Sequence, residues 1–376
     1  MSGVTAKGNR LIIRLTKPDG SFLTKLTMPF FQATSTTLPL THAVTGAYPS
    51  AGPYRFTRND PNVTSIRRNP YWKRGAGRMR PRHLAGLDVN WNQNEPRRDQ
   101  FDEVSPPPAE VQGLAHKYGV NKTRFWVEPV NCVGWLLFNN REGLFRNNIP
   151  MRKAVNWAVD RRAYLSVAAP FTGSPWTNLL PPGIPGASRA QPFAGAPKMP
   201  RARRLARGHF RSGKVSIVYL SSGTVNPNQA NSIRRDLIKL GFKPENVTLK
   251  GLSGSVIVFP PDRGWDIASS TGWCADYPDP YAFFLPLLSA RYYEPWAPAI
   301  AEPRYRREIA RAAQLIGNAR LRAFARVETE LMRNLAPVAP MRTYNNSYFF
   351  SNRVDPRSLS YQPVYSDWSI PELALK

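Results

Sequence analysis

The sequence has little cysteine, little histidine and no long apolar run. Only two cysteines and four histidines occur among 376 residues, and neither cysteine belongs to a CxxC pair or has a histidine nearby, which argues against a structural zinc site. The longest apolar runs are Cys132–Phe138 and Ala282–Leu288. Both are far shorter than the ~18–20 residues that a membrane-spanning helix needs. The first residues, MSGVTAKGNRLIIRLT, contain no apolar segment of the kind found in secretory signal peptides.

Motifs of catalysis and of cofactor binding are missing as well. The chain has no P-loop, no GxGxxG and no HExxH. Asp276 and Asp279 are separated by proline, so they cannot share a helical face as paired carboxylates for acid–base catalysis. The histidines have no serine or cysteine in a nucleophile context beside them: they are His42, His83, His116 and His209. The sequence therefore predicts no enzyme, no metal site and no cofactor.

Acidic residues are scarce relative to basic ones. The 25 Asp and Glu stand against 52 Lys and Arg, which gives a formal charge of +27. Such an excess is typical of proteins that bind nucleic acid. The arginines, however, are spread over three stretches, 67–82, 201–211 and 304–326, without a helix-turn-helix, zinc-finger or RNA-recognition pattern. We interpret them as a solvated basic surface, with a nucleic-acid- or surface-associated protein as the alternative.

The remaining composition is that of a folded protein with several lobes. Hydrophobic residues make up 42% and aromatic residues 11% of the chain, which is too apolar for disorder. The 37 prolines exclude a helical bundle. At roughly 100–200 residues per domain, the length allows two or three lobes.

Hydrophobic periodicity predicts mixed α and β structure. The first 35 residues read as β-structure, with LIIRLT, a turn at Asp19-Gly20 and then FLTKLTMPFF. The strand Tyr54–Thr57 is predicted to begin a hairpin. The segment VGWLLFNN after Cys132 is predicted to be a strand that is buried on both faces, and a helix is predicted to begin at Pro150. Further elements are predicted as strands at Lys214–Leu220, Asn246–Leu249 and from Trp265, and as helices at Asn226–Leu240, Tyr305–Ile316 and Arg320–Leu335.

Four segments together resemble the extracytoplasmic solute-binding proteins of ABC importers, family 5, of the oligopeptide- and dipeptide-binding type. They are, in the family's order, GAYPSAGPYRF…SIRRNPYW, FNNREGLFRNNIPMRKAVNWAVDRRAYL, GWDIASSTGWCADYPDPYAFFLPLL and RLRAFARVETELMRNLAPVAPM. One segment alone would be weak evidence, but four in order cover nearly the whole chain.

The resemblance implies an α/β, two-lobed periplasmic-binding-protein-like fold, of the class with an extra domain, whose lobes close on a ligand. It places lobe I at residues 36–131 and 354–376 and lobe III at 132–353. Residues 1–35 would be a remnant of the preceding lobe or extra domain, so the chain is expected to be N-terminally incomplete. The expected location is extracytoplasmic, in the periplasm or at the cell surface as an anchored lipoprotein, although these residues carry no export signal.

The resemblance also implies a ligand site at WCADY. In the peptide-binding branch, this strand pairs with an extended peptide, and the carboxylate at the position of Asp276 receives the peptide's α-ammonium group. Gly272 and Cys274 would contribute main-chain contacts, and Trp273 and Trp265 would wall the pocket. The alternatives are that Asp276 and Asp279 only end the strand and cap the next helix, and that both tryptophans belong to the core.

The two cysteines would be inert thiols in a cytosolic protein and a disulfide in an exported one. The family's peptide-binding branch has a bridge between these regions, so the resemblance implies a Cys132–Cys274 disulfide. The function implied is the substrate-binding component of an ABC importer, a monomer that delivers peptides to a permease and does not bind nucleic acid. Relatives that bind nickel chelates, haem or sugars make a non-peptide solute an alternative within the family.

Overall fold

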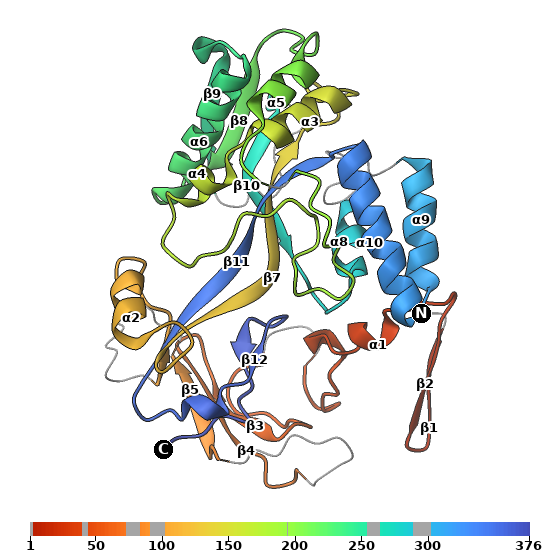
Figure 1. The fold of residues 1–376 in the computed structure, drawn as a ribbon. Coiled ribbons are helices and arrows are strands. Elements are labelled where there is room, and N and C mark those ends of the chain that lie inside the picture. Colours follow the sequence, from red (N-terminus) through yellow and green to blue (C-terminus); the bar gives the residue numbers. More distant parts are fainter. Residues whose placement is uncertain are drawn as a thin grey trace. The chain divides into compact units, whose positions relative to one another are not determined.

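The computed structural model describes residues 3–39, 44–72, 83–90, 102–193, 195–253, 264–288 and 302–376. His42 lies outside these residues. The chain divides into two compact units (Figure 1). Unit 1 contains residues 1–25, 130–168 and 172–344, and unit 2 contains residues 26–129, 169–171 and 345–376. The lobe boundaries expected from the sequence stay a prediction.

The largest sheet has the strand order β6-β11-β7-β10-β8-β9. Its strands are β6 (Glu103–Val104), β7 (Phe125–Phe138), β8 (Val215–Leu220), β9 (Val247–Leu252), β10 (Ile267–Cys274) and β11 (Val338–Phe350). β10 runs antiparallel to β7 and parallel to β8, and β8 runs parallel to β9. In β7, Val133 and Trp135–Phe138 are at most 1% exposed, which confirms the predicted doubly buried strand.

Unit 1 also contains several helices. They include α3 (Ile149–Ala158), α4 (Arg161–Leu165), α5 (Met199–Ala206), α6 (Val225–Leu240), α8 (Tyr281–Leu288), α9 (Pro303–Gln314) and α10 (Gly317–Asn334). Of these, α6 packs against β8, β9 and β10. The Asn148 side chain caps α3 by accepting from the Met151 amide, and Pro150 lies in its first turn, as predicted. Gly241 ends α6 at a φ of 137°, a conformation that a side chain disfavours.

The N-terminal residues of unit 1 differ from the prediction. Strands β1 (Gly3–Lys7) and β2 (Arg10–Arg14) form a hairpin, but the segment after it is helical: α1 spans Phe22–Lys25 and a 3₁₀ turn spans Pro29–Phe31 in unit 2. The predicted β-structure for FLTKLTMPFF is therefore wrong. The Asp19 carboxylate explains α1, because it accepts a hydrogen bond from the Ser21 amide at 2.9 Å and thereby starts a turn.

A long proline- and glycine-rich loop of unit 1, residues 173–198, is fixed by one buried carboxylate. Glu328 of α10 is fully buried. Its Oε1 accepts from the Leu180 amide at 2.7 Å and its Oε2 from the Ser188 amide at 2.8 Å. Two points of a loop without regular structure are thus tied to one helix.

Unit 2 contains a three-stranded antiparallel sheet of β3 (Tyr54–Asn59), β4 (Val63–Arg68) and β5 (Gly86–Asn90). This sheet confirms the hairpin predicted after Tyr54. The remaining elements of unit 2 are α2 (Val111–Tyr118), a 3₁₀ turn at Pro356–Ser358, β12 (Tyr361–Gln362) and β13 (Asp367–Trp368). Trp368 is 4% exposed and contacts the rings of Trp126, Tyr348, Phe350 and Tyr361. No helix in the described part of the chain is long and apolar enough to cross a bilayer.

Candidate functional site

The candidate site lies at the C-terminal end of β10, within unit 1. β10 pairs with β7 from Ile267 to Cys274, but it pairs with β8 only at Ile267 and Ala268. An irregularity between Ala268 and Thr271 separates the two regions, and Ser270 has a φ of 61° there. Bulges of this kind turn a strand and often occur next to functional sites. The second half of β10 is therefore placed by β7 and not by β8.

Gly272 has a structural reason to be glycine. It lies opposite Gly134 of β7, and a Cβ at this position would be 2.4 Å from the Val133 carbonyl oxygen. Only glycine permits so close an approach of two backbones. The predicted main-chain contact of Gly272 with a ligand stays a prediction.

Cys274 is joined to Cys132 by a disulfide, as the resemblance implied. The two residues are directly opposite in the β7–β10 register, with 4.0 Å between their Cα atoms. So short a distance is typical of a non-hydrogen-bonded pair in an antiparallel sheet, in which the amide and carbonyl groups of the two residues point away from each other. In agreement, the next residue, Ala275, donates its amide to the Asn131 carbonyl at 2.8 Å. The amide and carbonyl of Cys274 therefore point away from β7.

Asp276 follows this strand end and is exposed. Its carboxylate forms no hydrogen bond or ion pair with the described residues, and partial burial raises the pKa of Asp276. The role of Asp276 as the receptor of a peptide's α-ammonium group stays a prediction. In this structure the carboxylate is an acceptor available to an external donor.

Asp279 has a different environment. It is 6% exposed, and the Arg320 guanidinium donates to its two oxygens at 2.7 and 2.9 Å. It also accepts from the Tyr281 amide at 2.8 Å, at the start of α8. The sequence-based reading of Asp279 as a helix cap is confirmed, and its ion pair with Arg320 was not foreseen.

The two tryptophans also differ. Trp273 is half-buried, and its Nε1 donates to the Ala282 carbonyl at 2.9 Å, which ties β10 to α8. Trp265 is 3% exposed and packs in the core of unit 1. Its ring has no exposed face in this structure, and this burial does not support the predicted role of Trp265 as a wall of the ligand pocket.

A cluster beside the WCADY turn was missed from the sequence. The Lys25 ammonium is 2.6 Å from an Asp19 oxygen and lies 5.8 and 5.2 Å from the ring centroids of Tyr277 and Tyr281. The hydrogen bonds from Lys25 and Ser21 hold the pKa of Asp19 below its usual value, although burial opposes them. Local sequence could not have shown this contact, because its partners are some 250 residues apart.

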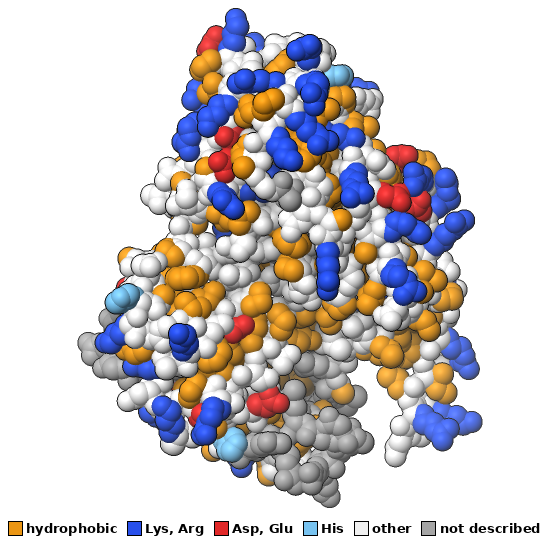
Figure 2. Space-filling model, viewed as in Figure 1, with side chains coloured by type: hydrophobic (Ala, Val, Ile, Leu, Met, Phe, Trp, Pro, Cys, Tyr) orange, Lys and Arg blue, Asp and Glu red, His pale blue; other side chains and the backbone are white. Residues whose placement is uncertain are grey.

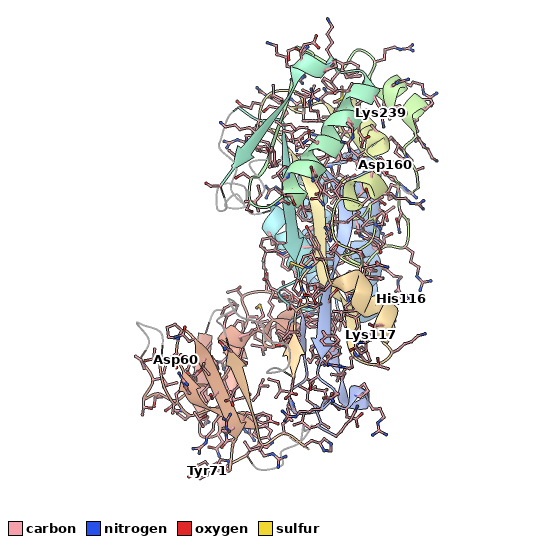
Figure 3. All side chains as sticks on the ribbon, turned by 90° about the vertical axis from the view of Figure 1, so that its left-hand side faces the viewer. Asp60, Tyr71, His116, Lys117, Asp160 and Lys239 are labelled. Carbon is pink, nitrogen blue, oxygen red and sulfur yellow. A yellow bond between two sulfur atoms is a disulfide. The ribbon has the colours of Figure 1, made fainter. Side chains whose placement is uncertain are left out.

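The described residues contain no group of three or more His, Cys, Asp or Glu side chains that could hold a metal ion. Figure 3 shows His116 on α2, beside Lys117. The chemistry at the strand end is therefore that of a carboxylate, main-chain groups and aromatic rings.

Comparison with known proteins gives a family match and a shared fold. The model for "Bacterial extracellular solute-binding proteins, family 5 Middle" matches residues 2–294. "Heme-binding protein A" of Haemophilus influenzae is 24% identical over 297 residues, which is 75% of this chain and 53% of that protein. The chain thus spans about half the length of this curated relative.

Solved structures with a similar fold cover essentially the whole chain. The clavulanic acid biosynthesis oligopeptide binding protein 2 has a TM-score of 0.83 at 18% identity, with 100% of this chain and 72% of that chain covered. DppA from Helicobacter pylori, in complex with the peptide STSA, has a TM-score of 0.71 at 20% identity, covering 100% and 74%. NikA from Brucella suis, in complex with Fe(III)-EDTA, has a TM-score of 0.77 at 19% identity, covering 100% and 79%. These likenesses confirm the predicted α/β fold of two-lobed periplasmic binding proteins.

Proposed function

The chain belongs to the bacterial extracellular solute-binding proteins of family 5, and from this premise we propose that it is the substrate-binding component of an ABC importer and captures peptides. Members of the family are solute-binding proteins that act outside the cytoplasm. Delivery to a membrane permease, a monomeric state and anchoring as a lipoprotein are parts of the same proposal. So is the assignment of residues 36–131 and 354–376 to lobe I and of 132–353 to lobe III.

One observation carries the choice of a peptide. The exposed carboxylate of Asp276 has no partner among the described residues, and it stands two residues after Cys274, whose amide and carbonyl point away from β7. An extended peptide offers main-chain groups to such a strand end and an α-ammonium group to the carboxylate. Main-chain pairing ignores side chains, so this arrangement would accept peptides of different sequence.

The test is a calorimetric titration of the whole chain with short peptides, free and N-acetylated. Removing one partner of a desolvated ion pair costs about 3–5 kcal/mol. We therefore expect Asp276→Ala to weaken binding of the free peptide by roughly two to three orders of magnitude. Asp276→Asn should lose nearly as much, because it keeps the shape but not the charge. Acetylated peptide should bind the wild type poorly, and Asp276→Ala should hardly distinguish the two peptides.

Glu245→Gln provides the matched control, because Glu245 is another exposed carboxylate of unit 1. This variant should bind like the wild type. Equal affinity of the wild type for free and acetylated peptide would rule out Asp276 as an ammonium receptor. Binding of haem without peptide binding would favour the activity named for the Haemophilus influenzae relative, and the same result with a metal chelate would favour the activity suggested by the NikA complex.

A further inference from the structure

Helix α5 presents an unusually uniform surface charge. Its eight residues and the residues flanking it include Lys198, Arg201, Arg203, Arg204 and Arg207, all of them exposed. The same stretch contains no aspartate or glutamate. Only Ala202 and Ala206 of the helix are buried. α5 therefore turns a small apolar face inward and a cationic face outward.

Several of these cations are held in place. The Arg203 guanidinium donates to the Lys239 carbonyl at 3.0 and 2.7 Å, and so attaches α5 to the C-terminal end of α6. The Arg201 guanidinium carbon lies 4.3 Å and the Lys198 ammonium 5.1 Å from the centroid of the Trp157 ring. Cation–π contacts of this kind fix long side chains against a ring. The cationic face is thus ordered, and less side-chain entropy is lost when it meets an anion.

Acidic side chains are few near this face, and among the described residues Asp236 pairs with one of its neighbouring cations: the Lys239 ammonium lies 3.9 Å from an Asp236 oxygen. Between Lys198 and Leu252 the only acidic residues are Asp236 and Glu245. Asp236 is 5% exposed, and one of its oxygens accepts from the Asp160 amide at 2.7 Å. Figure 3 labels Lys239 and Asp160, which lie in the same part of unit 1.

The cations continue onto α6 and the turn behind it. Arg235, Lys239 and Lys243 are exposed there, and α5 packs against α6. Figure 2 shows Lys and Arg side chains gathered over this part of unit 1. We name the surface formed by Lys198, Arg201, Arg203, Arg204, Arg207, Arg235, Lys239 and Lys243 the α5–α6 basic face. Lys153 lies at the border of this face. Burial lowers the pKa of Lys153, and the positive charges of Arg152 and Arg201 lower it further.

We propose that the α5–α6 basic face docks on the anionic phospholipid headgroups of a membrane. The face consists of cations alone, and the ring that Arg201 and Lys198 contact, Trp157 of α3, is only 8% exposed and so is not available for stacking on bases. Clusters of several Lys and Arg bind anionic bilayers, with about 1 kcal/mol contributed by each cation near the surface. Proteins of an extracellular family meet a membrane surface more readily than nucleic acid. The proposal is independent of peptide binding.

The experiment compares co-sedimentation of the whole chain with two kinds of vesicle, phosphatidylcholine alone and phosphatidylcholine mixed with phosphatidylglycerol. The wild type should bind only the mixed vesicles, and added salt should release it. The triple variant Arg204→Gln/Arg207→Gln/Arg235→Gln removes three exposed cations whose side chains form no hydrogen bond or close ion pair with the described residues. At about fivefold per cation, it should bind roughly a hundredfold more weakly. The Arg204→Lys/Arg207→Lys/Arg235→Lys variant keeps the charge and should retain most of the binding.

A control variant distinguishes this face from net charge. Arg307→Gln/Arg311→Gln/Arg326→Gln removes three equally exposed cations from α9 and α10, and it should bind almost like the wild type. An equal loss in the α5–α6 glutamine variant and in this control would overturn the proposal in favour of a general charge effect. It would also be overturned if the Arg204→Gln/Arg207→Gln/Arg235→Gln variant bound mixed vesicles like the wild type, or if the wild type bound duplex DNA and not vesicles. Near-UV circular dichroism confirms that each variant is folded.

Discussion

At the scale of single residues, two aspartates only three positions apart have opposite roles. Asp276 is exposed without a described partner, and Asp279 is buried against Arg320. The difference follows from the turn between β10 and α8, which directs Asp279 to the amide of Tyr281 and to α10. Arg320 also donates to the Ala312 and Ala313 carbonyls at 2.9 and 2.6 Å. This guanidinium therefore links the WCADY turn to the end of α9.

The first prediction at this scale concerns stability. Asp279→Ala leaves the buried Arg320 charge without its counterion, which should lower the free energy of unfolding of unit 1 by about 3–5 kcal/mol. Peptide affinity of the folded fraction should stay nearly intact. Arg304→Gln, which removes an exposed cation paired with Glu308 and Glu330, should change stability far less, because solvent screens these pairs. Urea unfolding measures both variants, and equal losses would contradict the assigned role of Asp279.

At the scale of elements, local patterns in the sequence predicted the helices that have a clear apolar face. The predicted helix Asn226–Leu240 is observed as α6 (Val225–Leu240), and Arg320–Leu335 is observed within one to three residues of α10. α5 was not predicted, because its buried residues are two alanines that leave little apolar periodicity. α1 was mistaken for a strand, since its turn depends on the side chain of Asp19.

The candidate site was predictable from the sequence only in part. Family resemblance gave the strand end with Asp276 and the Cys132–Cys274 pair. The partners that decide what each side chain does are remote in the chain: Arg320 for Asp279 and Lys25 for Tyr277. Such contacts depend on the assembled fold, and no local spacing encodes them.

A prediction at the element scale concerns the loop attached to α10. Burial raises the pKa of Glu328 from its usual value to about 7, although the Leu180 and Ser188 amides oppose the shift. The folded protein therefore retains a proton that the unfolded chain releases above about pH 4.5. Because the folded state binds more protons in this window, stability should fall as the pH rises from about 4.5 to about 7 and then level off.

Glu328→Gln removes this titration. As the pH rises from 5 to about 8, the free energy of unfolding of the wild type should fall by up to about 3 kcal/mol relative to that of Glu328→Gln. Asp236, whose pKa burial raises to about 6, titrates in both proteins and cancels in the difference. Urea unfolding at the two pH values gives the result, and a difference that does not change with pH would contradict the buried state of Glu328.

At the scale of the whole molecule, charge and topology set different properties. The charge of +27 belongs to the surface and governs encounters with anions, whereas the order of the strands is fixed by apolar burial. β7, β8 and β10 bring together segments that are far apart in the chain. The Cys132–Cys274 bond joins two of these strands across 142 residues, so it constrains most of unit 1 at one point.

Loss of this bond should destabilise unit 1 strongly. In the chain-entropy model, a closed loop of this length contributes on the order of 5 kcal/mol, as an upper figure. Cys132→Ser/Cys274→Ser should therefore melt at a clearly lower temperature than the oxidised wild type in scanning calorimetry. Dithiothreitol should lower the melting temperature of the wild type toward that of the double variant, because Cys274 is exposed to the reductant, and it should leave the variant unchanged. If the oxidised wild type and the double variant melt together, the bond does not constrain the unfolded chain, and the stability of unit 1 comes from the packing of β7 and β10 alone.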